Sequence, residues 1–533
     1  MSRDSRILER RRMASGLPSR SRGIGMGWLV LVLVALGAFL RFYRLGAQSL
    51  WIDEVLTIQA AELGGDLGPR EFFANIQGPL HALIIHFAAM ASPSARALRS
   101  VSAVLGTALI PVSYALGRTL VDRVTGLVAA VLVAVSPFAI WYSQEIRNYS
   151  LLMLFSGVAT VVVWRVVTEP KRSWAPYVLA AAVCVYSNLS AAFLVAAHAL
   201  FAARRSLRER AFMRRSLLAF VVVTLLAAPM LWGVSMWTEY AEVTERAAFA
   251  PEAEASELRR GDTTFSAMAV PYTAFSMAYG FSLGPSLREL HELDPMEAVL
   301  RHRGLVVPAG LALAFAFLLG LRRLAERRPR LVFVLLILLV PVVGTSLLAV
   351  FNIKPFNPRY LAVAFPAFVL TVAAGVGSLR RPAAFLLSGV FILFCLLSLK
   401  GYYFDTTYWK EDVRAAAYYV QLHEEPGDIV LVPVVRDVFN HYYDGSASRF
   451  VFYTGQAGSD AEVEARIEEW AEGARRLWYV AARTWDVDPE GRIGKYLEAG
   501  HELLDRSDFT GVSIYLYEMR GEAEDGRQAG QTA

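Results

Sequence analysis

The chain has 533 residues, of which 55% are hydrophobic, and a formal net charge of +5. This apolar fraction is too high for a soluble globular protein and indicates a polytopic membrane protein. The excess of basic residues does not indicate nucleic-acid binding, because the arginines lie between apolar runs. The two cysteines, Cys184 and Cys395, fall inside apolar runs, which excludes a disulfide framework.

About eleven apolar runs reach or approach the roughly 20 residues that a membrane span requires. They are residues 25–43, 97–117, 124–141, 150–168, 174–187, 189–203, 216–235, 304–321, 331–351, 360–379 and 383–400. The first run follows a basic segment, residues 1–24, without a small-residue cleavage site, so we expect an uncleaved span with a cytoplasmic tail. The run at 79–91 is too short to span and predicts an interfacial segment. With this assignment every basic cluster falls on the cytoplasmic side of a cell membrane.

The same topology leaves four sizeable segments on the outer face. They are residues 44–96, 138–149, 236–303 and 352–359. Within the third, the semi-apolar part from Phe265 to Leu283 predicts a segment that lies along the membrane. The acidic part from Glu239 to Asp262 is open to two interpretations, a mobile lid or an unstructured connector.

An acidic pair stands in the first outer segment, in Leu50-Trp-Ile-Asp-Glu-Val-Leu-Thr. Read as a helix, this stretch lies flat at the membrane surface and places Asp53 and Thr57 on one side. Adjacent helical residues point about 100° apart, so Asp53 and Glu54 cannot both face one substrate atom. We therefore predict Asp53 as the working carboxylate and Glu54 as a candidate catalytic residue behind it. Taken alone, the stretch favours an ordinary solvated acidic pair.

Cations follow in the other outer segments. Arg147 precedes Tyr149, and Lys354 and Arg359 flank a turn stiffened by two prolines, with Tyr360 next in the chain. Such cations often contact lipid head groups. Three of them from two separate loops would also suit a phosphate, which Arg binds through two parallel bonds and Lys as a point charge. A carboxylate opposite them could accept a proton from an attacking group, while the cations stabilise a leaving phosphate.

Other polar residues are weaker candidates. Glu145, Arg147 and Tyr149 could form an ion-paired group that anchors a helix end. Alternatively, Arg147 and Tyr149 could hold an anion, and Glu145 is then only an additional candidate. His81 and His86 are five residues apart, so they do not share one helix face. Packed or hydrogen-bonded histidines are the favoured interpretation. The sequence contains no zinc-protease motif, paired CxxC, phosphate-binding loop or nucleophile elbow.

The composition changes after residue 400. Residues 401–520 alternate strand-like and helix-like stretches, which predicts an α/β layer domain. The expected strands begin at Asp428, Arg449, Leu477 and Ser513, and the expected helices cover 409–423, 461–472 and 491–499. An odd number of spans places this domain outside the cell. Residues 521–533 are polar, and we expect them to be disordered.

Several motifs together resemble the GT-C membrane glycosyltransferases. Phe42-Tyr-Arg-Leu-Gly followed by Leu50-Trp-Ile-Asp-Glu is similar to their first loop, in the protein O-mannosyltransferase and aminoarabinose transferase (ArnT-like) group. Arg99-Ser-Val-Ser-Ala-Val-Leu-Gly resembles the second span of that group. The stretch from Ser136 to Tyr149 resembles the RgtABCD-like branch, and Pro358-Arg-Tyr resembles a later element. The match covers about residues 25–400 of the chain.

The resemblance implies a polyprenyl- or dolichyl-phosphate sugar donor, an inverting mechanism and Asp53 as the base. It also implies that outer loops hold the donor phosphate, here through Arg147, Arg359 and Tyr360. Where many relatives have His-Pro-Pro-Leu, this chain has Gln77-Gly-Pro-Leu, so Gln77 and His81 are only additional candidates. No carboxylate stands where one branch binds a metal. We therefore expect no tightly bound metal, and a loosely bound divalent cation is left open.

These observations predict a polytopic α-helical membrane protein that transfers a sugar from a polyprenyl-phosphate donor to a lipid, glycan or protein acceptor. The alternative is a lipid or sugar transporter or flippase. Such proteins usually carry ionisable residues and broken helices at mid-membrane, whereas the apolar runs here are nearly free of charge. A third interpretation is an inactive scaffold that acts through residues 401–520.

Overall fold

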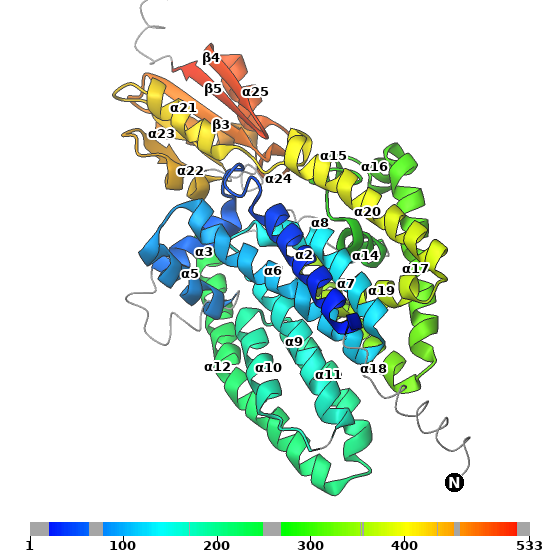
Figure 1. Ribbon diagram of the computed structural model, residues 1–533. Coiled ribbons are helices and arrows are strands. Elements are labelled where there is room, and N and C mark those ends of the chain that lie inside the picture. Colours follow the sequence, from blue (N-terminus) through cyan, green and yellow to red (C-terminus); the bar gives the residue numbers. More distant parts are fainter. Residues whose placement is uncertain are drawn as a thin grey trace, which may run out of the picture.

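The computed structural model describes residues 21–62, 78–169, 171–248, 268–351, 353, 356–433, 435–451 and 459–519. Most of the molecule is a bundle of long helices. A smaller α/β unit, residues 406–519, lies at one end of the bundle (Figure 1). The short helices α3 and α5 lie beside this unit, and α2 runs towards it (Figure 1).

Each predicted apolar run coincides with a helix or a helix pair. The helices are α2 (Ser21–Phe42), α6 (Ala95–Leu120), α7 (Arg123–Val135), α8 (Pro137–Ser143), α9 (Tyr149–Thr168), α10 (Ala175–Ser187), α11 (Ala191–Ser206), α12 (Arg210–Ala248), α17 (Arg303–Ala325), α18 (Arg328–Val350), the 3-10 helix η2 (Pro358–Ala364), α19 (Phe365–Gly377) and α20 (Arg381–Phe404). Within the described residues, seven helices are long and apolar enough to cross a membrane, or eight if a bent pair counts as one. The count of about eleven crossings therefore stays a prediction.

The run at 124–141 forms a broken helix. α7 and α8 meet at an angle of 54°, because Pro137 lacks the N–H that a continuous helix needs and Ser136 caps the new helix start. The buried Arg41 donates hydrogen bonds to the carbonyl groups that end α7, those of residues 133 and 134. This break directs the chain into residues 144–148, the loop that carries Arg147.

Close helix packing fixes η2, which carries Arg359. A Cβ atom at Gly320 of α17 would lie 1.9 Å from the carbonyl oxygen of Thr371 in α19, and one at Gly375 would lie 1.9 Å from that of Ala316. Small residues at such positions let two membrane helices approach closely. The span that contains η2 and α19 is accordingly 89% buried.

Two of the predicted outer segments, 44–96 and 236–303, contain further short helices. These are α3 (Ile52–Glu62), α5 (Pro79–Ala91), α14 (Ala269–Tyr279), α15 (Leu287–Glu292) and α16 (Pro295–Arg301). α5 has 13 residues, the length predicted for an interfacial segment. α14 lies inside the predicted membrane-lying part and packs against α8 and η2. Most of the acidic stretch after Glu239 lies outside the described residues.

Gly78 explains one departure from the family motif. Its φ is +133°, a conformation that proline cannot adopt and that favours glycine. A Cβ atom there would also lie 2.7 Å from the Asn148 side-chain nitrogen. The start of α5 therefore packs directly against the Arg147 loop, and this contact requires glycine.

The α/β unit contains a mixed five-stranded sheet. The strands are β1 (Ile429–Leu431), β2 (Ser448–Phe450), β3 (Arg476–Ala482), β4 (Glu502–Phe509) and β5 (Val512–Glu518), in the order β2-β1-β3-β5-β4. β1 pairs in parallel with β2 and β3, and β5 pairs antiparallel with β3 and β4. The helices are η3 (Thr406–Tyr408), α21 (Val413–His423), α22 (Arg436–Tyr442), α23 (Asp460–Ala471), α24 (Thr484–Val487) and α25 (Arg492–Gly500).

Each strand and helix predicted for this unit overlaps an element of the structure, and β4, α22 and α24 are additions. β4 alternates between exposed and half-buried residues and carries Glu502, Asp505 and Arg506, so it lacks the apolar pattern of a buried strand. It is recognisable only through its antiparallel pairing with β5.

A shared apolar core joins the α/β unit to α3. Val55 and Ile58 of α3 belong to the same buried cluster as Phe439 of α22. The Leu50 N–H also donates to the Tyr442 hydroxyl at 2.9 Å. The unit therefore holds in place the first outer segment, which carries the acidic pair.

Candidate active site

The acidic pair occupies the first turn of α3, and its two side chains diverge as predicted. The Asp53 side chain is 16% exposed, whereas that of Glu54 is fully buried. Carboxylates are favourable in the first turn of a helix because unpaired backbone N–H groups point at them. The two carboxylates belong to two charge clusters, one on each side of the turn.

The first, here called the Asp53 cluster, consists of Asp53, Arg147 and Arg359. Arg359 Nη1 lies 2.6 Å from Asp53 Oδ2, and Arg147 Nη2 lies 3.6 Å from the same oxygen. Arg147 Nη1 also donates to the Asp53 backbone carbonyl and to Thr57 Oγ1, both at 3.1 Å. Residues from the predicted outer segments 44–96, 138–149 and 352–359 thus meet in one place.

Aromatic rings border this cluster. The Arg147 guanidinium carbon lies 5.8 Å from the Tyr149 ring centre, and that of Arg359 lies 5.6 Å from Tyr360 and 6.0 Å from Trp51. Such distances permit cation–π attraction. Arg359 Nε is buried and has no hydrogen-bond partner within the described chain. That donor is therefore uncommitted.

The second, here called the Glu54 cluster, consists of Glu54, Arg99, Lys410 and Glu145. Arg99 holds Glu54 through two parallel bonds of 2.8 Å, the strongest arrangement for this pair. The Ile146 N–H donates to Glu54 at 2.9 Å, and Lys410 Nζ lies 3.3 Å away. Burial by itself would raise the pKa of Glu54, but Arg99, Lys410 and the Ile146 N–H lower it to about 2.

Glu145 is the less satisfied carboxylate of the Glu54 cluster. It is buried, and Lys410 Nζ lies 3.0 Å from its Oε1. Its Oε2 has no hydrogen-bond partner among the residues that the structure describes. Burial, helped by the nearby Glu54 charge, raises the pKa of Glu145 despite the ammonium group of Lys410. One ammonium thus serves two carboxylates from different segments.

The two histidines of α5 have different environments. His81 is buried, and desolvation together with the charge of Arg147 lowers its pKa to about 3, so it is neutral at physiological pH. His86 Nδ1 bonds to the Ala61 carbonyl at 2.8 Å, the packed role favoured from the sequence. In the described part of the chain, no three His, Cys, Asp or Glu residues are placed to hold a metal ion. The expectation about metals stays a prediction.

Two sequence-predicted residues, Gln77 and Lys354, lie outside the described residues. The sequence interpretation missed Lys410 and gave Arg99 no role. Arg99 carried a signal, since it is a charged residue inside the apolar run 97–117 and within a family motif. Lys410 follows Tyr408 and Trp409 directly after the last apolar run, but its partners are more than 260 residues away in the chain.

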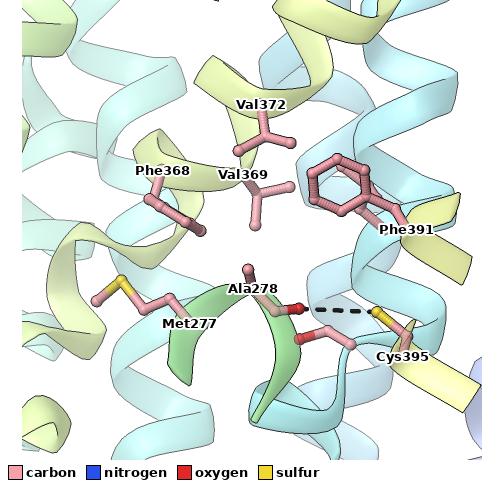
Figure 2. A pocket seen from close by; sticks show the side chains of 9 residues that line it. Met277, Ala278, Phe368, Val369, Val372, Phe391 and Cys395 are labelled. Carbon is pink, nitrogen blue, oxygen red and sulfur yellow. Dashed lines mark hydrogen bonds between the residues drawn. The ribbon is translucent and has the colours of Figure 1, made fainter. Parts of the chain in front are cut away.

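A small cavity elsewhere in the bundle shares no lining residue with these clusters (Figure 2). It is lined by Leu132, Ser136, Met277, Ala278, Phe368, Val369, Val372, Phe391 and Cys395. Its volume of about 20 Å³ suits roughly one water molecule. The Cys395 thiol points across its edge to the Ala278 carbonyl, 3.7 Å away. This cavity is too small for a sugar.

The fold and the site define a class of protein: a membrane-helix bundle with an acid and two guanidinium groups gathered at one end. Within that class, the family model described as dolichyl-phosphate-mannose-protein mannosyltransferase matches residues 77–237. That segment includes Arg99 and Arg147. No curated protein sequence matches the chain significantly.

Solved structures share the fold. ArnT from Cupriavidus metallidurans aligns over 92% of this chain and 98% of its own length, with 13% identity and a TM-score of 0.53 without ligand. The structure of the same enzyme bound to undecaprenyl phosphate aligns with a TM-score of 0.55, at the same identity and over the same fractions of the two chains. The apo oligosaccharyltransferase of Archaeoglobus fulgidus aligns over 95% of this chain and 76% of its own, with 11% identity and a TM-score of 0.50. The resemblance to the GT-C glycosyltransferases predicted from the sequence is confirmed.

Proposed function

We propose that this protein is an integral-membrane glycosyltransferase that moves a sugar from a polyprenyl-phosphate donor to a lipid, glycan or protein acceptor. The observation that carries this proposal is the Asp53 cluster. It combines a partly exposed carboxylate with two guanidinium groups from distant outer segments. The ArnT structure with bound undecaprenyl phosphate supports a lipid phosphate as the ligand of this fold.

The charge of the site suits a phosphodiester. The two clusters contain four cations, Arg99, Arg147, Arg359 and Lys410, and three carboxylates. At least one positive charge therefore remains uncompensated, and the bound donor phosphate carries one negative charge. Arg359 Nε is available as a donor to a phosphate oxygen, and charge-assisted bonds of this kind are strong.

The proposed reaction is a single displacement. The acceptor oxygen or nitrogen forms a bond to the anomeric carbon while the bond from that carbon to the phosphate oxygen breaks, which inverts the configuration. Asp53 takes the proton from the acceptor. The electron pair of the broken bond stays on the phosphate, where Arg147 and Arg359 stabilise the second negative charge as it develops. The products are the glycosylated acceptor and a polyprenyl phosphate.

Tyr149 and Tyr360 would border the donor phosphate, and Glu54 would act from behind the site. We propose that the N-terminus is cytoplasmic and that the α/β unit is extracytoplasmic. Asp53 lies in the first turn of α3, and α3 packs against the α/β unit, which supports a site at the outer membrane surface (Figure 1). Selective labelling of single cysteines at residues 24 and 472 in intact cells tests this orientation.

The activity is testable in proteoliposomes. A panel of undecaprenyl-phosphate hexoses and pentoses would be presented with an envelope extract as the source of acceptor, and sugar transfer would be followed by mass spectrometry. Transfer by the wild type that is lost in Asp53→Asn and kept in Gln59→Ala, an exposed position of α3, supports the proposal. Movement of the lipid across the bilayer without transfer of any sugar would instead indicate a flippase.

A further inference from the structure

Lys410 stands at the junction of the α/β unit and the membrane bundle. The segment that contains it is held to the α/β unit on one side, where Glu411 pairs with Arg483 at 2.6 Å. On the other side the Lys410 N–H donates to Gln48 Oε1 at 3.3 Å, in the first outer segment. Its side chain is only 9% exposed, so the backbone and side chain of Lys410 are both fixed.

The ammonium group of Lys410 links two separate elements of the site. It lies 3.3 Å from Glu54, in the first turn of α3, and 3.0 Å from Glu145, in the loop after α8. Asp53 and Arg147 are the next reactive groups on those same two elements. The distance between α3 and this loop therefore sets the geometry of the Asp53 cluster.

Lys410 also offsets the repulsion between the negative charges of Glu54 and Glu145. Glu54 and Glu145 are buried, and like charges at short range repel strongly where water is excluded. The Trp51 ring, 5.2 Å from the ammonium group, and the Trp141 ring, 6.0 Å away, close the remaining sides. Without a cation at this point, the repulsion between the two carboxylates would push α3 and the loop apart.

We infer that Lys410 is a positioning residue that uses the α/β unit to clamp α3 against the Arg147 loop, and so aligns Asp53 with the donor phosphate. This inference rests on the proposed function. It gives the α/β unit a part in the reaction, although neither the unit nor Lys410 contacts the proposed position of the substrate.

The test compares Lys410→Met with Lys410→Arg in the full-length protein in proteoliposomes, using a donor from the panel above that the wild type accepts. Lys410→Met should lower kcat at least tenfold and change the KM for the donor less than about threefold, because both guanidinium groups of the Asp53 cluster remain. The dissociation constant of Lys410→Met for undecaprenyl phosphate should also change less than about threefold. Lys410→Arg keeps the charge and should retain at least a third of kcat.

Two further variants separate positioning from simpler roles. Arg414→Met removes another contact between the α/β unit and the first outer segment, the 2.9 Å bond to the Ala47 carbonyl, without touching a carboxylate. It should stay within twofold of the wild-type kcat. A loss as large as that of Lys410→Met would reduce Lys410 to a general tether and overturn the inference.

A double variant, Lys410→Met with Glu145→Gln, also removes the carboxylate charge that loses its partner in Lys410→Met. The thermal midpoint of the double variant should therefore return towards that of the wild type. Its kcat should remain at least threefold low, because the link that Lys410 makes from the α/β unit to both α3 and the loop is still absent. Full recovery of kcat would mean that Lys410 only neutralises Glu145, and the inference would fall. If the wild type transferred no sugar from any donor of the panel, the proposed function would fail instead.

Discussion

Asp53 and Glu54 are neighbours in one helical turn, yet their environments are opposite. Asp53 faces two guanidinium groups and retains some exposure to solvent. Glu54 is fully buried, bound by Arg99 through two bonds and further held by Lys410 and a backbone N–H. The cations beside Asp53 could also bind a substrate phosphate, whereas the groups around Glu54 are all engaged in holding Glu54 itself.

Under the proposed function, this difference separates reaction from support within a single turn of α3. A buried charge is tolerated only when it is paired and hydrogen-bonded, and Glu54 meets this condition through residues of two other segments. Those bonds fix the direction in which Asp53 points. We therefore expect replacement of Asp53 to affect turnover and replacement of Glu54 to affect folding.

The largest expected effect is that of Asp53→Asn on turnover. The amide cannot accept the proton, so sugar transfer should fall by about 10²–10⁴-fold, the usual contribution of a general base. Because Asp53 is near the surface of the cluster, the thermal midpoint in detergent should change little. Gln59→Ala, on the exposed side of α3, is the control and should keep full activity. Normal turnover by Asp53→Asn would end the role assigned to it.

Glu54→Gln should show the reverse pattern. Breaking a buried ion pair by removing one partner typically costs about 3–5 kcal/mol, since Arg99 would be left as a buried charge without its carboxylate. Thermal unfolding in detergent should therefore begin at a clearly lower temperature. Surviving folded protein should still bind undecaprenyl phosphate. An unchanged midpoint would contradict the supporting role of Glu54.

Arg359→Ala should weaken binding of undecaprenyl phosphate. Loss of a charge-assisted hydrogen bond costs about 1.5–3 kcal/mol, which is roughly a tenfold to hundredfold rise in the dissociation constant. Quenching of tryptophan fluorescence in nanodiscs would measure it. The exposed Arg380, at the start of α20, gives a matched control, and Arg380→Ala should bind like the wild type. Equal losses in both variants would show that the effect is only one of net charge.

The smallest effects should appear in the pH dependence of stability. The pKa of Glu54 is depressed from its ordinary value of 4.5 to about 2, so its contribution is complete above pH 4.5 and is lost as the pH falls towards 2. The penalty of Glu54→Gln should shrink in that window. The pKa of Glu145 is raised above its ordinary value of 4.5, so its buried carboxylate destabilises the fold once it ionises. This penalty is absent below pH 4.5 and grows as the pH rises towards the raised pKa.

Glu145→Gln should consequently match or exceed the wild-type thermal midpoint at pH 7.5, and this advantage should vanish when the pH is lowered below 4.5. Midpoints of the two glutamine variants measured between pH 3 and pH 8 give the comparison. A destabilised Glu145→Gln at pH 7.5 would show that the pair with Lys410 outweighs the burial of the carboxylate.

Local pattern was sufficient to predict much of the fold. Apolar runs marked the helices, and α5 was recognised as too short to span because length alone decides that point. The break between α7 and α8 was missed, although Pro137 is its direct cause. β4 was missed because its residues are polar and its stability comes from pairing with β5.

The three residues of the Asp53 cluster were predicted together, and the part of Lys410 in the Glu54 cluster was missed. Asp53, Arg147 and Arg359 were found because a carboxylate and cations in outer segments suggest one chemical purpose. The pairing of Glu54 with Lys410 spans 356 residues of sequence. Nothing local in either segment indicates that contact, since it depends on how the α/β unit packs on α3.

The most direct test is a cryo-electron microscopy map of the Asp53→Asn protein in nanodiscs with an undecaprenyl-phosphate sugar. Our account predicts the phosphate between the guanidinium groups of Arg147 and Arg359, with the anomeric carbon facing residue 53. A phosphate bound at another place, with residue 53 facing only protein, would contradict it.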